Sequence, residues 1–287
     1  MDSKIILVTG ASDGIGKETA MTLAKQGHTV IIHGRNKQKL QAVYNEIKAE
    51  TGNTNIDMFA ADFLSFTEIK RFADTIKTKY DHLDVLINNA GAQFTDKRET
   101  TIDGHEKTMM INVFAPFLLT TLLLDLFKKS PSARVVTVAS AAHKMSGKPN
   151  LSDIELIDNY TMAKAYGVSK LYVIWVMRHF VTEMKKAGIN NIAFNCVHPG
   201  SVVTNLARES LASFRYRIIM FLWKPMMISL IKGAKSSIEA AVSPKLEGVT
   251  GKYFGPKGEE KVSDKYYSTQ NEQIIWDYCL KVTEDYR

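Results

Sequence analysis

The stretch NYTMAKAYGVSK, residues 159–170, contains the pattern Tyr-x-x-x-Lys twice. Tyr160 is followed by Lys164, and Tyr166 is followed by Lys170. An unperturbed tyrosine has a pKa of about 10 and is a poor base near neutral pH. A lysine ammonium one helical turn away stabilises the phenolate, and the i, i+4 spacing brings both side chains to one helix face. Either pair could therefore exchange a proton with a substrate oxygen.

The two pairs lie six residues apart, which is roughly 120° around a helix, so they cannot both face one site. Asn159 and Thr161 are candidate N-caps, and a cap there would leave Tyr160 ahead of the helix. The face that starts at Tyr166 is almost uninterrupted in its apolar character, as expected of a helix packed on a sheet, and continues through Lys170, Val173, Met177, Phe180 and Val181. These observations favour Tyr166 and Lys170 as the pair that does chemistry.

Short β-branched runs alternate with longer helical patterns along the first 200 residues. Strands are expected in KIILVT, TVIIHG, IDMFAAD, LDVLINN, ARVVTVAS and NIAFNCVHPG. Helices are expected from Ile15, Asn36 and Ser65, up to about Lys129, and through Tyr166 to Lys186. This alternation predicts a Rossmann-type, doubly wound α/β sandwich with a mainly parallel central sheet and helices on both faces. No linker or repeat interrupts it, so residues 1–287 are predicted to form one domain.

Residues 201–232 break this alternation with the run FRYRIIMFLWKPMMISLIK. We predict that this insertion, mainly residues 205–231, is a substrate lid with an adaptable apolar surface, formed by Met220, Phe221, Trp223, Met226 and Met227. The competing interpretation is an interfacial helix that touches a membrane through Arg215, Arg217 and Lys224. A helix in GAKSSIEAAVSP and a strand in GKYFG then resume the pattern.

The first expected strand leads directly into TGASDGIGKETA. Glycines at a strand-to-helix turn let the backbone approach a pyrophosphate closely, and the helix N-terminus offers unpaired N–H groups. A tight turn could also require glycine for its own geometry. Because this turn follows the first strand and precedes a helix, we interpret it as a dinucleotide site that comprises Gly10, Ser12, Asp13, Gly14, Ile15 and Gly16.

The second expected strand ends in IIHGRNK and carries no acidic residue. An acid at this place would hold the ribose 2′-hydroxyl of NAD, whereas Arg35 can form a forked contact with the 2′-phosphate of NADP. We therefore predict that NADP(H) is the preferred cofactor, with NAD(H) as the alternative, and that Asn36 belongs to the same site. Lys17 could add a second cation, but a solvated helix position explains it equally well.

Polar residues also close other expected strands, at the carboxyl edge of the sheet where doubly wound folds bind ligands. A capping role for the following helix explains Asp62 about equally well. For Asn88–Gly91 and for the serine in TVAS, helix capping alone is a weaker explanation of why polar residues end these strands. We therefore assign to the cofactor or substrate Asp62, Phe63, Asn89, Ala90, Gly91 and Ser140.

The sequence resembles the short-chain dehydrogenase/reductase family over nearly its whole length. The motifs that carry this resemblance follow one another in the family's order and rough spacing, and they are TGASDGIG, NNAG, Ser140, Tyr-x-x-x-Lys and HPG followed by VVT. TGASDGIGKETA, ASAAH, AYGVSKL and GVTGKYF resemble its retinol dehydrogenase-type branch. The resemblance implies hydride transfer between a nicotinamide and the carbonyl or alcohol carbon of a lipophilic substrate, commonly with NADP(H). It also favours Tyr166, because AYGVSKL matches the family's extended pattern and YTMAKAY matches only two residues.

The resemblance further implies roles for individual residues. Ser140 would hydrogen-bond the substrate oxygen and orient it toward Tyr166. Lys170 would also hold the nicotinamide ribose, and Asn112 would support a water chain to this lysine. A bridging water or a helix bulge would give Asn112 a buried partner, and exposure to solvent is the alternative. The segment HPGSVVT would line the nicotinamide, without a proton role for His198, through Pro199, Gly200, Val202 and Thr204.

Charge and composition narrow the partners. The formal charge of +7 does not indicate nucleic-acid binding, because most lysines are interleaved with acids on amphipathic stretches. Cys196 and Cys279 give no disulfide framework, which fits a reducing compartment. The N-terminus lacks the features of a signal peptide, and the apolar run 113–124 is too short to cross a bilayer. We expect a cytoplasmic protein without a transmembrane segment or metal site, with weak interfacial contact through 215–231 as an alternative.

Two expected helices, with FAPFLLTTLLLDLF and LYVIWVMRHF, carry apolar residues on more than one face. The resemblance implies that they pair across a homodimer or dimer-based tetramer interface, and an unusually buried monomer core is the alternative. A dinucleotide-sensing protein that does no chemistry would also fit the fold. The complete set of Asn112, Ser140, Tyr166 and Lys170 favours an NADP-preferring carbonyl reductase or alcohol dehydrogenase over such a sensor.

Overall fold

The computed structural model describes residues 3–201 and 229–287. In these residues one sheet has the strand order β3-β2-β1-β4-β5-β6-β7-β8. The strands are β1 (Ile5–Val8), β2 (Thr29–Gly34), β3 (Ile56–Ala60), β4 (Val85–Asn88), β5 (Ala133–Val138), β6 (Ile192–Val197), β7 (Tyr253–Gly255) and β8 (Gly258–Glu259). Every neighbouring pair is parallel except β7 and β8. The predicted doubly wound α/β fold with a mainly parallel sheet is confirmed.

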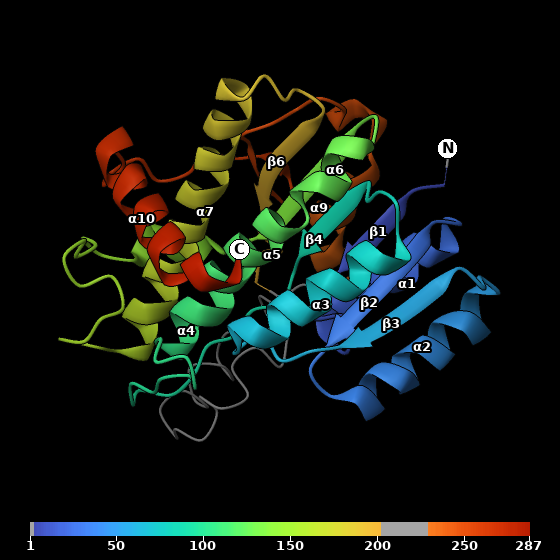
Figure 1. The fold of residues 1–287 in the computed structure, drawn as a ribbon, viewed down its shortest axis with the longest axis horizontal. Coiled ribbons are helices and arrows are strands. Elements are labelled where there is room, and N and C mark those ends of the chain that lie inside the picture. Colours follow the sequence, from blue (N-terminus) through green and yellow to red (C-terminus); the bar gives the residue numbers. More distant parts are fainter. Residues whose placement is uncertain (1–2, 202–228) are drawn as a thin grey trace.

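Helices cover both faces of the sheet (Figure 1). They are α1 (Gly14–Lys25), α2 (Lys37–Thr51), α3 (Phe66–Lys79), α4 (Lys107–Met109), α5 (Ala115–Leu122), α6 (Leu124–Lys129), α7 (Met162–Lys186), α9 (Leu230–Val242) and α10 (Thr269–Val282). A π-helical turn, η1 (Met110–Phe114), and short 3-10 helices, η2 (Ala141–Met145), η6 (Pro244–Leu246) and η7 (Glu284–Tyr286), complete the described helical segments.

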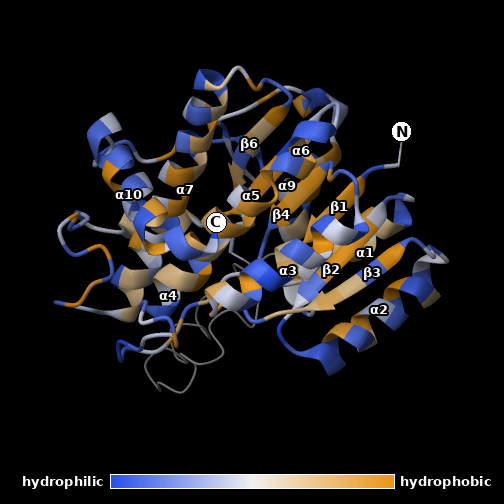
Figure 2. Cartoon of the chain, in the orientation of Figure 1, coloured by the Kyte–Doolittle hydropathy of each residue, from blue (hydrophilic) through white to orange (hydrophobic). Residues whose placement is uncertain are grey.

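Alternate strand residues point into two separate cores. Leu7 and Leu86 belong to the core shared with α3, α5, α7 and α10, whereas Ile6 and Ile87 belong to the core shared with α1, α2 and α9. Strands buried on both faces must be apolar throughout, and β1 and β2 are accordingly among the most hydrophobic segments (Figure 2). This double burial explains the near-continuous apolar runs that the sequence shows.

The long helix expected up to Lys129 is divided into α4, η1, α5 and α6. The π-helical turn η1 interrupts the regular hydrogen-bond pattern, and Pro116 in the first turn of α5 has no N–H to donate. Leu123 then leaves the helical region, with φ of −97° and ψ of 2°, which separates α5 from α6. The helical stretch expected up to Lys129 thus ends there, but it is made of four segments.

Helix α10, which the sequence analysis did not predict, packs along α7 (Figure 1). The indole of Trp276 meets the rings of Phe117 in α5 and Phe180 in α7 edge to face, at 5.1 and 4.8 Å between centroids. Glu272 and His179 are both buried and lie 3.0 Å apart. Part of the apolar surface that we assigned to a dimer is thus covered by the chain itself, and a dimer would need the surface that α10 leaves open.

No helix in the described ranges combines the length and hydropathy that crossing a bilayer requires. The insertion predicted as a substrate lid falls mainly on residues 202–228, which lie outside the described residues. Of this insertion the structure describes Ser201 and the residues from Ser229 onward, where Ser229 caps α9 by accepting the N–H of Lys232.

Candidate active site

The predicted site residues gather at one edge of the sheet. Because the strands are parallel, the segments that follow them meet at the carboxyl edge, on both sides of the β1–β4 neighbours where the strand order changes direction. From β1 to β6, the residues that follow each strand at this edge include Gly10, Arg35, Asp62, Asn89, Ser140 and His198. Residues spread over nearly 190 positions of sequence are therefore brought to one edge.

The glycine-rich turn requires its glycines for two different reasons. Gly10 and Gly14 have φ of +65° and +56°, which residues with a side chain rarely adopt. A Cβ added to Gly16 would lie 2.3 Å from the carbonyl oxygen of Gly10, so close packing requires glycine there. Nothing lies within 4 Å of a Cβ built on Gly14, and Asp13 caps α1 by accepting the N–H of Gly14 at 2.8 Å. The turn thus presents open backbone at a helix N-terminus, which fits a pyrophosphate.

Two further residues brace this turn from beside it. The side-chain amide of Asn89 donates to the carbonyl oxygens of Thr9 and Gly10, at 2.8 and 3.2 Å. The backbone N–H of Ala90 donates to the Thr9 hydroxyl at 3.0 Å. A Cβ on Gly34 would lie 2.9 Å from the Cβ of Ser12, so a glycine at the end of β2 leaves room for the turn. Asn89 therefore stabilises the conformation of the turn by bonding two of its carbonyl oxygens.

His33 is a site residue that the sequence analysis missed. Its Nδ1 accepts the N–H of Gly10 at 3.3 Å, so Nε2 carries the proton and donates to the carbonyl of Ala61 at 3.0 Å. Burial lowers the pKa of His33 from 6.5 to about 4, which keeps this neutral form. The imidazole stacks on Phe63 at 3.8 Å, and the neighbouring Asp62 accepts a backbone N–H two residues along the chain. His33 thus links the turns that follow β1 and β3.

The residues after β2 differ in how far they are engaged. Arg35 is exposed at this edge. Asn36 caps α2, because its side-chain oxygen accepts the N–H of Lys39 at 2.9 Å. Lys17 lies 2.6 Å from Glu46 on α2, which favours its interpretation as a helix-surface residue. Of the two cations considered for this site, Lys17 pairs with Glu46 and Arg35 is exposed.

Tyr166 and Lys170 lie one turn apart on α7, which Thr161 caps. Lys170 is 4% exposed, and its Nζ donates to the carbonyl of Val138 at 2.9 Å. The same Nζ lies 5.7 Å from the centroid of the Tyr166 ring. Burial lowers the pKa of Lys170 from 10.5 to about 8, so the lysine is mainly charged at neutral pH. A phenolate on Tyr166 would have this cation close by.

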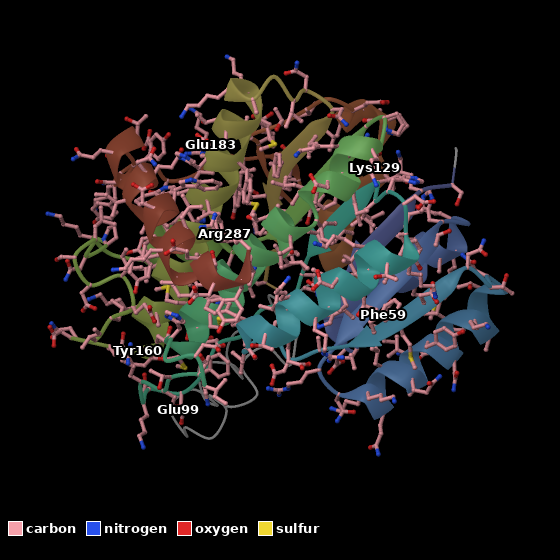
Figure 3. The ribbon with its side chains drawn as sticks, viewed as in Figure 1. Phe59, Glu99, Lys129, Tyr160, Glu183 and Arg287 are labelled. Carbon is pink, nitrogen blue, oxygen red and sulfur yellow. The ribbon has the colours of Figure 1, made fainter. Side chains whose placement is uncertain are left out.

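Tyr160 precedes α7, as predicted, and its hydroxyl donates to the carbonyl of Thr95 at 3.2 Å. It lies beside the loop between β4 and α4, where Glu99 is also found (Figure 3). Burial raises the pKa of Tyr160 to about 12, in the opposite direction from that needed for proton exchange near neutral pH. The first of the two Tyr-x-x-x-Lys matches is therefore structural.

Ser140 is the N-cap of η2, and its Oγ accepts the N–H of Ala142 at 3.2 Å. This leaves the hydroxyl hydrogen to be donated elsewhere, as a substrate oxygen requires. A Cβ on Gly167 would lie 2.9 Å from Cα of Ser146 and 3.3 Å from the carbonyl oxygen of Ala142. The glycine directly after Tyr166 therefore allows η2 to pack closely on α7.

Asn112 lies in η1 and is 2% exposed, so the alternative of a solvent-facing side chain is wrong. Its Oδ1 accepts the N–H of Ala92 at 3.2 Å, and its Nδ2 donates to Oγ of Ser169 at 3.1 Å. A Cβ on Gly91 would lie 2.8 Å from Asn112 Oδ1 and 3.3 Å from Lys170 Nζ. The helix bulge thus gives Asn112 its partners, and Gly91 lets the asparagine and the lysine approach.

After β6, Pro199 and Gly200 continue the edge toward the insertion. Gly200 has φ of +77°, and its N–H donates to Nδ1 of His198 at 3.2 Å. Val202 and Thr204, which we assigned to the nicotinamide, lie outside the described residues. The described ranges contain no group of three or more His, Cys, Asp or Glu side chains placed to hold a metal ion.

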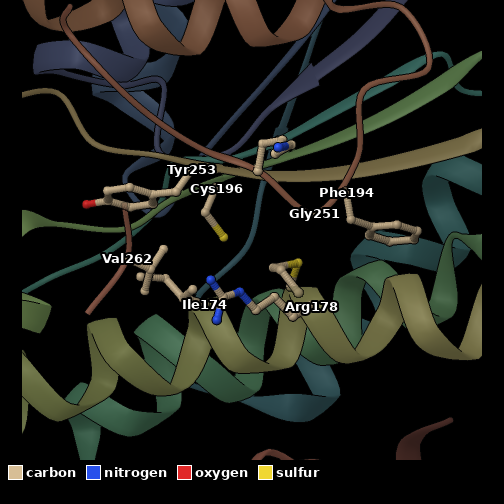
Figure 4. Close-up of a pocket in the computed structure, with 9 residues that line it drawn as sticks. Ile174, Arg178, Phe194, Cys196, Gly251, Tyr253 and Val262 are labelled. Carbon is tan, nitrogen blue, oxygen red and sulfur yellow. The ribbon is translucent and has the colours of Figure 1, made fainter. Parts of the chain in front are cut away.

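A small cavity lies between α7 and the strands β6 and β7, lined by residues that include Ile174, Arg178, Cys196 and Tyr253 (Figure 4). Its volume of about 10 Å³ holds at most one water molecule. Burial raises the pKa of the Cys196 thiol to about 12, so this cysteine is not a nucleophile at neutral pH. The cavity is too small for a substrate.

Comparisons with known proteins show which family the chain resembles. A family model described as short chain dehydrogenase matches residues 4–213. The chain is 36% identical to human polyprenol dehydrogenase over 284 residues, covering 98% of this chain and 85% of the relative. It is 34% identical to mouse retinol dehydrogenase 12 over 279 residues, covering 97% of this chain and 86% of the relative.

Solved structures show the same fold. A short chain dehydrogenase from Shigella flexneri, solved in complex with NADP, superposes with a TM-score of 0.69 at 28% identity, covering 90% of this chain and 98% of that one. An uncharacterized protein from Mycobacterium paratuberculosis superposes with a TM-score of 0.77 at 27% identity, covering 98% and 93%.

Proposed function

Because the chain belongs to the short-chain dehydrogenase family, we propose that it is an NADP(H)-dependent oxidoreductase that transfers hydride to or from the carbonyl or alcohol carbon of a lipophilic substrate. The observation that carries the proposal is the pair of Tyr166 and buried Lys170 on α7, with η2 and its Ser140 packed against the same helix. The names of the similar polyprenol and retinol dehydrogenases support a lipophilic alcohol.

The nicotinamide, when bound, supplies or accepts the hydride. In the reducing direction, Ser140 donates its hydroxyl hydrogen to the substrate oxygen, and the phenol of Tyr166 gives that oxygen a proton. The charged Lys170, near the tyrosine, stabilises the phenolate that remains. Asn112 fixes the relation between η1 and α7 through Ser169. The glycine-rich turn would hold the pyrophosphate, and Arg35 would select the 2′-phosphate.

The competing proposal, a dinucleotide sensor without chemistry, has no use for a tyrosine beside a buried lysine. The oxidoreductase and the sensor can be distinguished by following NADPH oxidation with a panel of retinal, polyprenal, steroid ketones and short polar aldehydes. We expect turnover with the lipophilic carbonyls, and a loss of about 100-fold or more in kcat for Tyr166→Phe with unchanged NADPH binding. Tyr160→Phe is the matched control and should keep its kcat.

Tight NADPH binding without turnover of any carbonyl, and no difference between Tyr166→Phe and the wild type, would favour the sensor. Best turnover with a short polar aldehyde would contradict the lipophilic substrate. We further propose a cytoplasmic location, because the two cysteines, Cys196 and Cys279, are free and buried, which suits a reducing compartment. Fractionation of cells with an antibody against the chain tests this location.

A further inference from the structure

His143 lies three residues after Ser140, within η2, and is 1% exposed. Its Nε2 lies 3.2 Å from the backbone nitrogen of Ser263, and its Nδ1 lies 2.7 Å from the carbonyl oxygen of Ser140. A backbone N–H can only donate, so Nε2 is the acceptor and the ring proton sits on Nδ1. The imidazole therefore donates to Ser140 and accepts from Ser263.

The surroundings favour this neutral form. Burial lowers the pKa of His143, the Ser140 carbonyl acts against this shift, and the nearby cations Lys144 and Arg178 add to it. A second ring proton would also remove the acceptor that the N–H of Ser263 uses. His143 therefore serves as one donor and one acceptor, aimed at two segments that lie 120 residues apart.

The segment 260–263 also contacts a second histidine, through a side chain. His198 accepts the N–H of Gly200 through Nδ1, so its Nε2 donates to Glu260, 3.1 Å away. A Cβ on Gly255 would lie 1.9 Å from Glu260 Oε1 and 2.4 Å from His198 Nε2, so glycine is required for this contact. The ring of Tyr253 packs on both imidazoles, edge to face with His143 at 5.2 Å and stacked with His198 at 5.4 Å.

Two further hydrogen bonds involve Ser140. The carbonyl oxygen of Ser140 also accepts the backbone N–H of His143 at 3.2 Å, and Ser140 Oγ accepts the N–H of Ala142. The imidazole contact with this carbonyl, at 2.7 Å, is the shortest of these, and through Nε2 the same ring also accepts the N–H of Ser263, which lies outside η2. Without the imidazole, the turn would keep its backbone N–H bonds and its packing on α7, but it would lose the shortest contact to the Ser140 carbonyl and the link to Ser263.

We propose that His143 is a positioning residue for Ser140. By donating to the Ser140 carbonyl and accepting from Ser263, it fixes the start of η2 and hence the direction in which Ser140 presents its hydroxyl hydrogen. His143 does not touch the substrate itself. The inference rests on the proposed function for its kinetic consequences, but the restraint on η2 can be measured without turnover.

Two substitutions separate the two bonds of the ring. The amide nitrogen of asparagine falls near the place of Nδ1, so His143→Asn keeps the donor to Ser140. The amide of glutamine reaches the place of Nε2, so His143→Gln keeps the contact with Ser263 and loses the donor to Ser140. We expect kcat to fall about 10- to 100-fold for His143→Gln with unchanged NADPH affinity, and to stay within about threefold of the wild type for His143→Asn.

A double-mutant cycle tests whether the effect passes through Ser140. In a Ser140→Ala background, His143→Gln should reduce the remaining kcat by less than about twofold, because the group that it positions is gone. His28→Gln is the control for loss of a buried histidine, since His28 lies just before β2 at the opposite edge of the sheet. It should leave kcat unchanged.

Hydrogen–deuterium exchange of residues 140–146 completes the test without a substrate. Exchange should stay slow in His143→Asn and become about tenfold faster in His143→Gln. Equal exchange in both variants, or equal losses of kcat, would overturn the positioning role. A third outcome is possible: exchange is slow in the wild type and faster in His143→Gln, but no carbonyl is turned over. This outcome would support the positioning of η2 and contradict the proposed function.

Discussion

The cofactor side and the substrate side of the active-site edge are completed by different parts of the chain. On the cofactor side, the turn after β1 is braced by His33 and Asn89, which end or follow its two neighbouring strands. On the substrate side, the last third of the chain supplies the supports, through Glu260 and Ser263 on the two histidines and through α10 on α7. The direct hydrogen-bond supports of the turn thus come from β2 and from the segment after β4, whereas those of the substrate side come from the C-terminal segment.

Because the two sides have different supports, substitutions in each should affect different properties. A change in α10 should cost stability on the α5 and α7 side and leave the glycine-rich turn intact. A change in the turn should cost NADPH affinity and leave α10 in place.

The largest effect is expected for Trp276→Ala in α10. The indole is 8% exposed and fills the space between Phe117, Phe180 and His179. Its removal should lower the free energy of unfolding by about 3–5 kcal/mol, measured by urea denaturation, while NADPH affinity changes by less than about threefold. Trp276→Phe, which keeps an aromatic ring, should lose less than half as much. A loss of NADPH affinity in parallel with stability would contradict the separation of the two sides.

Gly16→Ala should act on the cofactor side. The added methyl group would lie 2.3 Å from Gly10 O and 2.4 Å from Asn89 Nδ2, so the turn must move. We expect NADPH affinity, measured by fluorescence titration, to fall about 100-fold, because the backbone can no longer approach the pyrophosphate. Gly27→Ala is the control, since it has a positive φ but nothing within 4 Å, and it should cost stability without cofactor affinity. Unchanged affinity in Gly16→Ala would place the cofactor elsewhere.

The parts of the cofactor side and the substrate side that could be predicted are those held by contacts between residues close in sequence. Strand ends, helix starts and the glycine-rich turn depend on neighbours in sequence. Asn36, Ser65 and Thr161 cap their helices within three residues, and each was predicted as a helix start or candidate cap. The cap at Thr161, which leaves Tyr160 ahead of α7, was one of these local signals, whereas the choice of Tyr166 rested mainly on the extended motif AYGVSKL.

The supports of the site were not predictable in the same way. His33 and His143 bond to backbone atoms, which any residue possesses, so no partner motif marks them. The partner of His143 lies 120 residues away, in a stretch without a strong pattern. The helix α10 was not predicted, so nothing in the sequence showed that it covers part of α7. The apolar residues on more than one face of α7 were therefore assigned to a dimer interface, with a buried monomer core as the alternative.

His33 makes the cofactor side sensitive to acid. Its pKa is lowered from 6.5 to about 4 by burial, so below pH 6.5 the unfolded chain takes up a proton that the folded chain does not. Stability from this residue is fully present above pH 6.5 and is lost as the pH falls toward 4, by up to about 3 kcal/mol. His33→Asn, which keeps an acceptor for Gly10 N–H, should show a correspondingly weaker fall. Identical pH dependence of the two proteins, by urea denaturation, would contradict a neutral His33.

The smallest effect is expected for Arg35→Gln, which tests the outermost part of the cofactor side. Arg35 is exposed and no acidic residue precedes α2 in IIHGRNK, so its guanidinium is free of a neighbouring carboxylate in that turn. Removing one exposed charge-assisted contact should raise the KM for NADPH about tenfold and leave the KM for NADH unchanged. Lys17→Gln is the control, because Lys17 already pairs with Glu46, and it should change neither value by more than about twofold. A parallel rise for both cofactors would mean that Arg35 supports the fold of the turn and does not recognise the 2′-phosphate.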